Sequence, residues 1–230
     1  MEDDFLTNSI PDSQRRALIR TTQNAYMEIF PTRSVESSLH VLPRGSHVAV
    51  TCSPTRGVDA TLEFSERLVA AGFKIIPHIS ARSLRGSEHL DRVLKRLGDL
   101  RIDSLFVVGG DNSAPAGPYS TALHLLRAIA ERDHKFKSIG VAAHPEGHPQ
   151  ASSDLLLTQL RKKQEFADYL VTQMCFDASL LAEWLVDIRE RGISLPAWIG
   201  VPGVADRTRL VATSLRIGVG DSLRFLRSPS

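Results

Sequence analysis

A chain of 230 residues with 42% hydrophobic and 23% charged residues has the composition of a globular protein with a substantial core. Its net charge of +2 gives no basis for nucleic-acid binding, and it lacks the roughly 18 consecutive apolar residues of a membrane helix. Only two cysteines are present, which argues against a disulfide framework and fits a reducing cytoplasm. We expect one cytoplasmic domain over residues 1–230, with residues 1–10 as a loose leader.

Seven apolar runs rich in β-forming residues recur about every thirty residues along the chain. The predicted strands are 26–30, 47–52, 74–80, 104–110, 138–144, 169–176 and 197–202. Amphipathic patterns predict helices at 14–22, 60–71, 90–97, 121–132, 152–166, 179–191 and 205–216. Gly72, Gly98 and Gly192 lie where helix C-caps are expected.

Strict alternation of strands and helices predicts a parallel sheet, either closed as a barrel or open and doubly wound. An open dinucleotide-binding sheet should carry G-x-G-x-x-G after its first strand, but Pro31-Thr32-Arg33 follows that strand here. We therefore predict a TIM-type (β/α)8 barrel, of which seven strands are readable. Residues 217–226 resemble a Gly-rich turn, so the eighth strand is absent from the sequence, or the barrel is open, or another chain completes it.

Polar residues lie in or directly after most of the predicted strands, and the carboxyl ends of barrel strands form the active site. Glu28 is the sharpest candidate, because it is a lone carboxylate in an apolar strand. Burial would raise its pKa, as a general acid requires. Alternation places Tyr26, Glu28 and Phe30 on one face of the strand. The alternatives are an outward-facing side chain or an ion pair with Arg33.

Two other strand ends carry groups that can recognise a heterocycle. Asp111 follows two glycines that let a ligand approach the backbone, and its carboxylate can hold a pair of N–H groups. The alternative for Asp111 is a turn residue. Gln173 donates and accepts hydrogen bonds, so it can read a ring edge, or it is a core amide bonded to a neighbouring strand.

The densest polar cluster is His144-Pro145-Glu146-Gly147-His148-Pro149. Its prolines disfavour a helix and the order His-Glu-x-x-His is absent, so we predict a rigid loop that lines the site and no metal centre. His78 is either a ligand contact or a core histidine. Thr51 and Cys52, at the end of the second strand, stay open between a structural and a functional role.

Six ordered motifs resemble the methylenetetrahydrofolate reductase family, from Tyr26 to about Gly203. The motifs are Met27-Glu28-Ile29-Phe30-Pro31-Thr32-Arg33 (F-E-F-F-P-P-R in the family), Pro77-His78-Ile79-Ser80 (P-H-L-T), Gly110-Asp111 (G-D), Ala143-His144-Pro145-Glu146-Gly147-His148-Pro149 (A-Y-P-E-x-H-P), Val171-Thr172-Gln173-Met174-Cys175-Phe176-Asp177 (I-T-Q-x-F-F-D) and Ile199-Gly200-Val201-Pro202-Gly203 (I-I-P-G).

The resemblance implies a TIM barrel that reduces 5,10-methylenetetrahydrofolate to 5-methyltetrahydrofolate, in one-carbon metabolism and methionine biosynthesis. It implies that Glu28 is the acid that helps to open the imidazolidine ring to a 5-iminium cation. It also implies that Asp111, Gln173 and Phe176 bind the folate. The partners would then be a folate substrate and a nicotinamide dinucleotide.

In the family, hydride passes from NADH or NADPH through bound FAD. The residues that match cofactor-contact positions are Thr51, His78, His144, His148, Arg161 and Lys162. The residue types differ from the family at three flavin positions: His144 stands in place of a tyrosine, and Leu155 and Thr158 stand where an aspartate and an asparagine are expected. We therefore expect FAD binding to be weakened or lost and hydride to pass directly from NAD(P)H.

Two other functions compete with a reductase. The chain is alternatively a non-catalytic folate-binding or partner subunit of a reductase complex, or another folate-dependent barrel enzyme such as a methyltransferase. Retention of Glu28 favours an enzyme, because a binder needs no buried acid. Arg33, Arg56 and Arg82 are candidates to bind the 2′-phosphate of NADPH.

Overall fold

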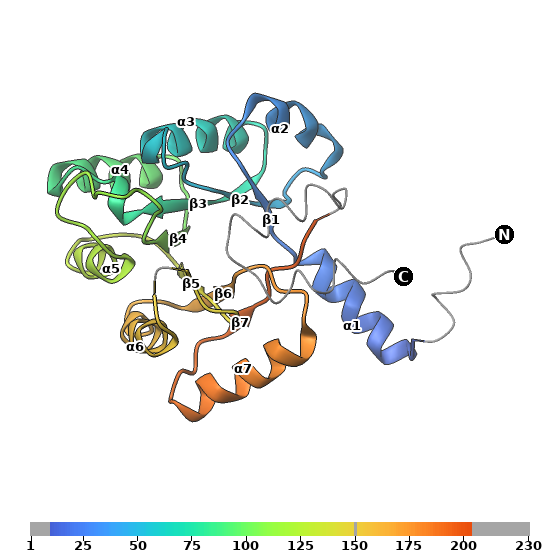
Figure 1. Cartoon of the computed structure of the whole chain (residues 1–230). Helices are drawn as coiled ribbons and strands as arrows, with labels where there is room; N and C mark the ends of the chain where they lie inside the picture. Colours follow the sequence, from blue (N-terminus) through green and yellow to red (C-terminus); the bar gives the residue numbers. More distant parts are fainter. Residues whose placement is uncertain (1–9, 150, 204–230) are drawn as a thin grey trace.

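Seven parallel strands pair in chain order and curl into the wall of a TIM-type α/β barrel, as predicted (Figure 1). The computed structural model describes residues 10–149 and 151–203. The strands are β1 (Met27–Ile29), β2 (His47–Val50), β3 (Lys74–Ser80), β4 (Ser104–Val108), β5 (Ser138–Ala143), β6 (Tyr169–Thr172) and β7 (Ala197–Trp198). Several strands end earlier than predicted, because the polar, Gly and Pro residues at their carboxyl ends form loops.

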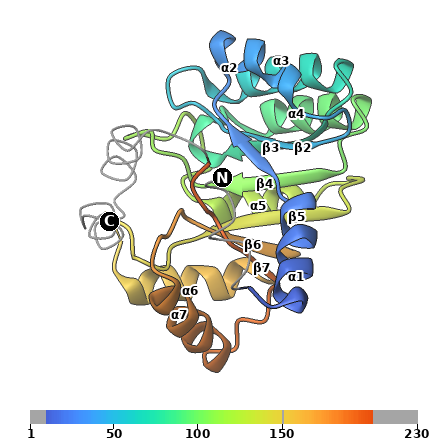
Figure 2. The ribbon, with the colours of Figure 1, turned by 90° about the vertical axis from the view of Figure 1, so that its right-hand side faces the viewer.

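The helices cover the outside of the curved sheet, apart from α1, which extends away from it (Figures 1 and 2). They are α1 (Asp12–Gln23), α2 (Arg33–Ser38), α3 (Gly57–Ala70), α4 (Ser87–Asp99), α5 (Ala122–Ala130), α6 (Ser153–Lys163) and α7 (Ala178–Glu190). The sequence did not predict α2, a short serine-rich helix that Thr32 caps by accepting a hydrogen bond from the Val35 N–H at 3.3 Å. Among the described residues, no helix is both long and apolar enough to cross a bilayer. The predictions for 1–9, 205–216 and 217–226 lie outside the described residues.

Two of the three predicted glycine caps are confirmed. Gly72 and Gly192 follow α3 and α7 with φ angles of +90° and +79°. The prediction for Gly98 is wrong, because Gly98 lies inside α4 and Arg101 takes the left-handed conformation with φ +56°. The helix continues past Gly98 because the Ile102 N–H closes its end on the Leu97 carbonyl at 3.0 Å.

The two faces of the sheet bury different side chains. The outward face packs aliphatic residues against the helices, among them Val48, Val50, Ile75, Ile79, Leu105, Val107, Val141 and Leu170. The inward face forms a smaller cluster of Ala49, Ile76, Phe106 and Tyr169, with Tyr26, Val108, Ala142 and Val171 packed against it. Since Ile29 belongs to the outer core and Tyr26 to the inner cluster, alternation places Glu28 on the inward face, as predicted.

The seam between β1 and β7 is open in its backbone pairing among the described residues, and an aromatic contact bridges it. The Tyr26 ring stacks on the Trp198 ring with a centroid distance of 4.8 Å and an interplanar angle of 18°. The Tyr169 ring meets Trp198 edge-on at 6.5 Å, which links the seam to the inner cluster. In the described part of the chain, β1 pairs only with β2 and β7 only with β6. The barrel wall is therefore weakest at the strand that carries Glu28.

Candidate functional site

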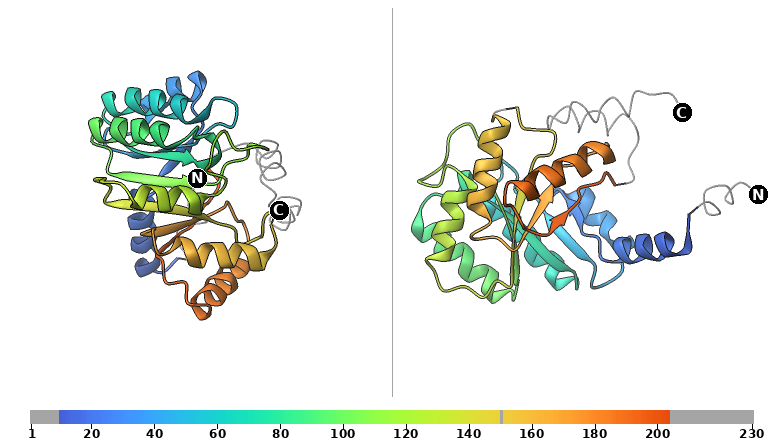
Figure 3. Two further views of the ribbon diagram at one scale, coloured as in Figure 1. Left: turned by 90° about the vertical axis from the view of Figure 1, so that its left-hand side faces the viewer. Right: turned by 90° about the horizontal axis from the view of Figure 1, so that it is seen from below.

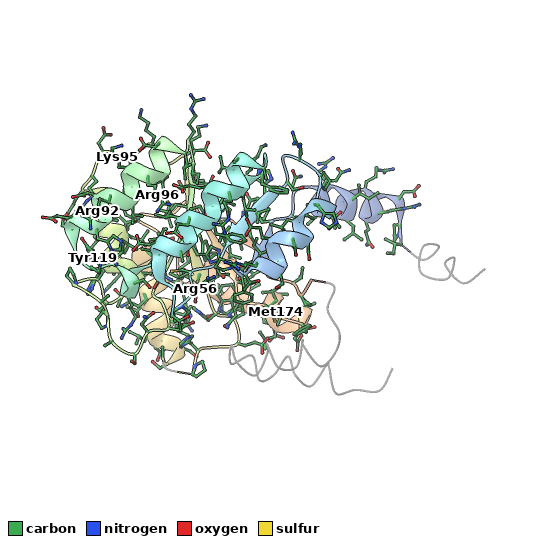
Figure 4. All side chains as sticks on the ribbon, turned by 90° about the horizontal axis from the view of Figure 1, so that it is seen from above. Arg56, Arg92, Lys95, Arg96, Tyr119 and Met174 are labelled. Carbon is green, nitrogen blue, oxygen red and sulfur yellow. The ribbon has the colours of Figure 1, made fainter. Side chains whose placement is uncertain are left out.

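The loops that follow the strands collect at one end of the barrel, which we call the mouth. Figure 4 labels Arg56, before α3, and Met174, after β6, on the side opposite the α4 residues Arg92, Lys95 and Arg96. Backbone hydrogen bonds extend the sheet register into these loops: the Thr51 N–H donates to Ile29 and the Gln173 N–H to Ala143, at 3.0 and 2.8 Å. The predicted polar residues at the strand ends therefore share one end of the sheet.

Glu28 lies on the inward face of β1. Its register partner is Ala49, a member of the inner cluster. The residue is exposed to solvent, whereas the sequence suggested burial; the difference arises because β1 is a three-residue strand at the open seam. Protein atoms nevertheless surround the carboxyl group closely enough that desolvation raises its pKa. The alternative ion pair with Arg33 is not formed among the described residues.

His78 and Thr51 lie next to the mouth on neighbouring strands. The His78 ring is 8% exposed and packs on Phe106 with centroids 4.5 Å apart. Burial lowers the pKa of His78 to about 4, so the ring is neutral at physiological pH. The Thr51 hydroxyl is buried and has no hydrogen-bond partner in the described structure. A buried hydroxyl with unused capacity can bind a ligand, so the cofactor assignment of Thr51 stays a prediction with physical support.

Asp111 projects from a loop that only glycine permits. Gly110 has a φ of +96°, and a Cβ at this position would overlap the Ser80 hydroxyl. Asp111 is exposed and forms no hydrogen bond or ion pair with the described residues, so it does not serve as a turn cap. Its carboxylate is thus available to a ligand.

Arg82 holds the loop that carries Asp111. Its guanidinium donates to the carbonyls of Asn112, Ser113 and Ser120 at 2.6, 2.6 and 3.2 Å. These bonds use Nε and both terminal nitrogens, so Arg82 is a positioning residue and is a poor candidate for the 2′-phosphate.

Gln173 lies in the loop after β6 and not inside a strand, because β6 ends at Thr172. The loop is fixed by Gly200, whose N–H donates to the Thr172 hydroxyl at 2.9 Å and whose carbonyl accepts from the Cys175 N–H at 3.3 Å. A Cβ at Gly200 would lie 2.5 Å from the Thr172 carbonyl oxygen, so the approach requires glycine. Gln173 and Phe176 are both half-buried. Asp177 then caps α7 by accepting from the Ser179 and Leu180 N–H groups.

The histidine loop after β5 is compact. The His144 and His148 rings meet edge to face with centroids 5.1 Å apart, and His148 bridges to Ala151. Burial, together with the positive charge of Lys163, lowers the pKa of His144 to about 4. Within residues 10–149 and 151–203, no group of three or more His, Cys, Asp or Glu side chains is arranged to hold a metal.

Helix α6 separates into an exposed and an enclosed side. Arg161 and Lys162 are exposed in its last turn, and Leu155 is exposed in its first part. Lys163 is half-buried as a residue, but its ammonium is enclosed and donates to the Ala142 carbonyl at 2.8 Å. Burial lowers the pKa of Lys163 to about 8. The sequence analysis missed Lys163; successive helical residues are turned by about 100°, so the third of three basic residues can point away from the exposed side.

The positions of the two cysteines fit a structural role. Cys52 is half-buried at the end of β2, Cys175 is buried after β6, and both are free thiols. Burial raises the pKa of Cys52, which disfavours the reactive thiolate.

Comparison with known proteins identifies relatives of one kind. The family model described as methylenetetrahydrofolate reductase matches residues 33–210. A Zea mays protein named methylenetetrahydrofolate reductase (NADH) 1 is 26% identical over 206 residues, which cover 77% of this chain and 34% of the maize protein. Methylenetetrahydrofolate reductase 1 of Schizosaccharomyces pombe is 29% identical over 133 residues, covering 54% of this chain and 22% of the yeast protein.

A third relative carries the other nicotinamide in its name. The probable methylenetetrahydrofolate reductase (NADPH) of Caenorhabditis elegans is 37% identical over 86 residues, covering 36% of this chain and 12% of its own. The alignments span about a third or less of each of these relatives. Among solved structures, a β-mannanase from Thermomonospora fusca aligns at 13% identity over 83% of this chain and 74% of its own, with a TM-score of 0.38, which establishes no relationship.

Proposed function

The chain belongs to the methylenetetrahydrofolate reductase family, and from this premise we propose that it reduces 5,10-methylenetetrahydrofolate to 5-methyltetrahydrofolate with NADH or NADPH. The observation that carries the proposal is Glu28, a carboxyl group with a raised pKa on the inward face of the barrel. A mere folate binder has no use for an acid at this position. The proposal also rests on Asp111, whose carboxylate is not engaged by the described residues.

The first step is proton transfer from Glu28. The acid protonates N10 of the folate, the bond from N10 to the bridging methylene breaks, and a 5-iminium cation forms. The raised pKa supports this role because desolvation favours the acid form, and general acids contribute about 10²–10⁴ to the rate. Solvent exposure allows Glu28 to recover its proton from water after each turnover.

Asp111, Gln173 and Phe176 would hold the substrate. A carboxylate can accept two parallel N–H bonds from the amidine-like edge of the pterin, and the free state of Asp111 suits this. Gln173 complements a ring edge, because its amide both donates and accepts. The aromatic ring of Phe176, half-buried after β6, offers a stacking surface.

The second step is hydride transfer to the iminium carbon. Hydride from C4 of the reduced nicotinamide converts the methylene to a methyl group, and NAD(P)⁺ is released. Two features favour the nicotinamide at this place. The Thr51 hydroxyl has unused hydrogen-bonding capacity, and the neutral ring of His78 adds no positive charge against the nicotinamide cation that develops.

We infer that this transfer is direct and that FAD takes no part. The donor set of α6 does not fit a dinucleotide flavin, because an exposed Leu155 and Thr158 offer neither a carboxylate nor an amide to its ribose. Arg161 and Lys162 are exposed basic residues that would attract any pyrophosphate, including that of NAD(P)H.

The test is a nicotinamide-oxidation assay with each of NADH and NADPH, with and without added FAD. We expect oxidation that depends on methylenetetrahydrofolate and is unchanged by FAD, and purified protein without a flavin absorption band. Oxidation of neither nicotinamide would refute the reductase. A stoichiometric flavin band would refute only direct transfer.

The competing function is a folate-binding or partner subunit. In such a protein the folate-binding residues Asp111 and Gln173 would serve binding alone. The two functions separate in one experiment: a binder retains folate affinity and shows no turnover with either nicotinamide, alone or with FAD.

A further inference from the structure

A cavity lies on the flank of the barrel, and neither Glu28 nor Asp111 lines it. It encloses about 270 Å³ between the end of β5, α6 and α7. Helices α6 and α7 lie side by side at the lower end of the molecule in Figure 2 and in the left panel of Figure 3. Its wall includes Lys163 of α6 and Asp187 of α7, which are the features that need an explanation.

Within residues 10–149 and 151–203, no carboxylate forms an ion pair with the ammonium of Lys163. Its one hydrogen bond goes to the Ala142 carbonyl at 2.8 Å, although an ammonium can donate three. Asp187 is the carboxylate on the opposite wall, but it binds Arg191 at 2.7 Å and forms no ion pair with Lys163. An enclosed ammonium without an anion is costly, and that cost falls when an anion enters the cavity.

The remainder of the wall is mostly apolar. Leu156, Leu157 and Leu160 line it from α6, and the Trp184 ring lines it from α7. Leu160 is buried in the outer core, while Leu156, Leu157 and Trp184 are half-buried, so an apolar body would rest on side chains that already pack against the core. The only other titratable group in this wall is His144, which is neutral at physiological pH.

We propose that this cavity binds a small organic carboxylate with an apolar body, its carboxylate on the Lys163 ammonium and its body against Leu156, Leu160 and Trp184. A single ammonium with two unused N–H donors matches one carboxylate. A phosphate dianion would bring two charges to one ammonium and would be stripped of water by the leucine wall. The inference does not depend on the proposed reductase activity.

The carboxylate could come from a simple acid or from an amino acid. An amino acid would add an ammonium, for which Asp187 offers an acceptor. The compounds 4-methylpentanoate and leucine share the same apolar body and differ only in the α-amino group, so they distinguish these sources. Inorganic phosphate is the third probe, because it carries charge without an apolar body.

The experiment is acetylation footprinting of the full chain, read by mass spectrometry, with each probe in turn. Its lowered pKa makes Lys163 reactive once it is reached by the reagent, and a bound carboxylate should shield it. We expect 4-methylpentanoate or leucine to slow acetylation of Lys163 about tenfold at saturation. Lys162, which is exposed one residue away, serves as the internal control and should not change.

Binding measured by calorimetry gives the second readout. We expect Lys163→Met to lose the binding of the protective probe, and Lys135→Met, a change at an exposed lysine away from the cavity, to retain it. Should Lys163→Met fail to fold, the footprint of the unaltered chain still decides. No protection by either carboxylate, or protection by phosphate alone, would overturn the proposal.

Discussion

Charged side chains have different partners in two regions of the molecule. One region is the loops after β1 to β4, and the other is the flank formed by β5, α6 and α7. In the first region, arginines are bound to backbone: Arg56 donates to the Pro31 carbonyl at 2.8 Å, and Arg82 donates to three carbonyls. The acids Glu28 and Asp111 are left without a basic partner among the described residues. On the flank, the base Lys163 has no acidic partner in the part of the chain that the structure describes.

The two regions are therefore suited to ligands of opposite charge. The first offers an acid and a carboxylate anchor to a cationic or N–H-rich substrate. The flank offers an ammonium and leucines to an apolar anion. One region could therefore keep the chemistry of a family while the other changes its ligand, and variants on the two sides should have separable effects.

Glu28→Gln should give the largest effect. Replacing the carboxylic acid with an amide removes the proton donor and preserves the shape of the side chain. Turnover should therefore fall about 10²–10⁴-fold, and the folate affinity should be almost unchanged. Glu63→Gln, at an exposed position on α3, is the control that should keep full activity. Equal losses in the two variants would break the assignment of the acid.

His78→Phe should alter stability at acid pH. The pKa of His78 is lowered from 6.5 to about 4 in the folded chain. Between these two pH values the unfolded chain binds a proton at this histidine and the folded chain does not, so acid favours unfolding. The unaltered chain should thus lose on the order of 3 kcal/mol of unfolding free energy between these values, and the variant should not.

Urea unfolding at pH 7 and at about pH 4.5 measures this difference. His144→Phe is the matched variant on the flank, where a half-buried ring should give a smaller change because solvent screens it. An identical pH dependence in His78→Phe and the unaltered chain would show that His78 is not buried as described.

Asp111→Asn should act on binding more than on chemistry. Loss of a charge-assisted hydrogen bond costs about 1.5–3 kcal/mol, so the KM for the folate should rise about tenfold to a hundredfold with kcat nearly constant. Asp133→Asn, an exposed position outside the site, should match the unaltered chain. A fall in kcat at constant KM would place Asp111 in the chemical step instead.

Arg82→Lys should give the smallest effect. Lysine keeps the charge but cannot reach three carbonyls in one plane, so the Asp111 loop should loosen at a cost of about 1 kcal/mol in folding and a few-fold rise in folate KM. The ratio of rates with NADH and NADPH should not move. A shift of that ratio would mean that Arg82 reads the 2′-phosphate after all.

Much of the fold is predictable from the sequence because the buried strands and helix faces consist of apolar residues in recognisable patterns. The strand β3 matches its prediction from Lys74 to Ser80, since both faces of this strand are buried and its sequence is almost uninterrupted. The helix α2 escapes such reasoning, because six residues rich in serine carry no periodic apolar face. Gly98 misleads because a tertiary contact of Leu97 with the core continues the helix beyond it.

The candidate site is predictable in its residue types and less so in their surroundings. Glu28, Asp111 and Gln173 stand out as polar groups at strand ends, and their elements bring them to one end of the sheet. Whether Glu28 is open to water depends on how the seam between β1 and β7 closes, which no local pattern encodes. The enclosure of Lys163 depends likewise on α7, which is separated from α6 in the sequence by strand β6.

The stacking of Tyr26 on Trp198 has a spectroscopic consequence. The chain contains two tryptophans, and they fall one to each region: Trp198 at the seam beside the Glu28 strand, and Trp184 in the wall of the flank cavity. Intrinsic fluorescence therefore contains two local reporters. Trp184→Phe leaves an emission that follows the seam, and Trp198→Phe leaves one that follows the cavity, so the events in the two regions can be observed separately in solution without an added dye.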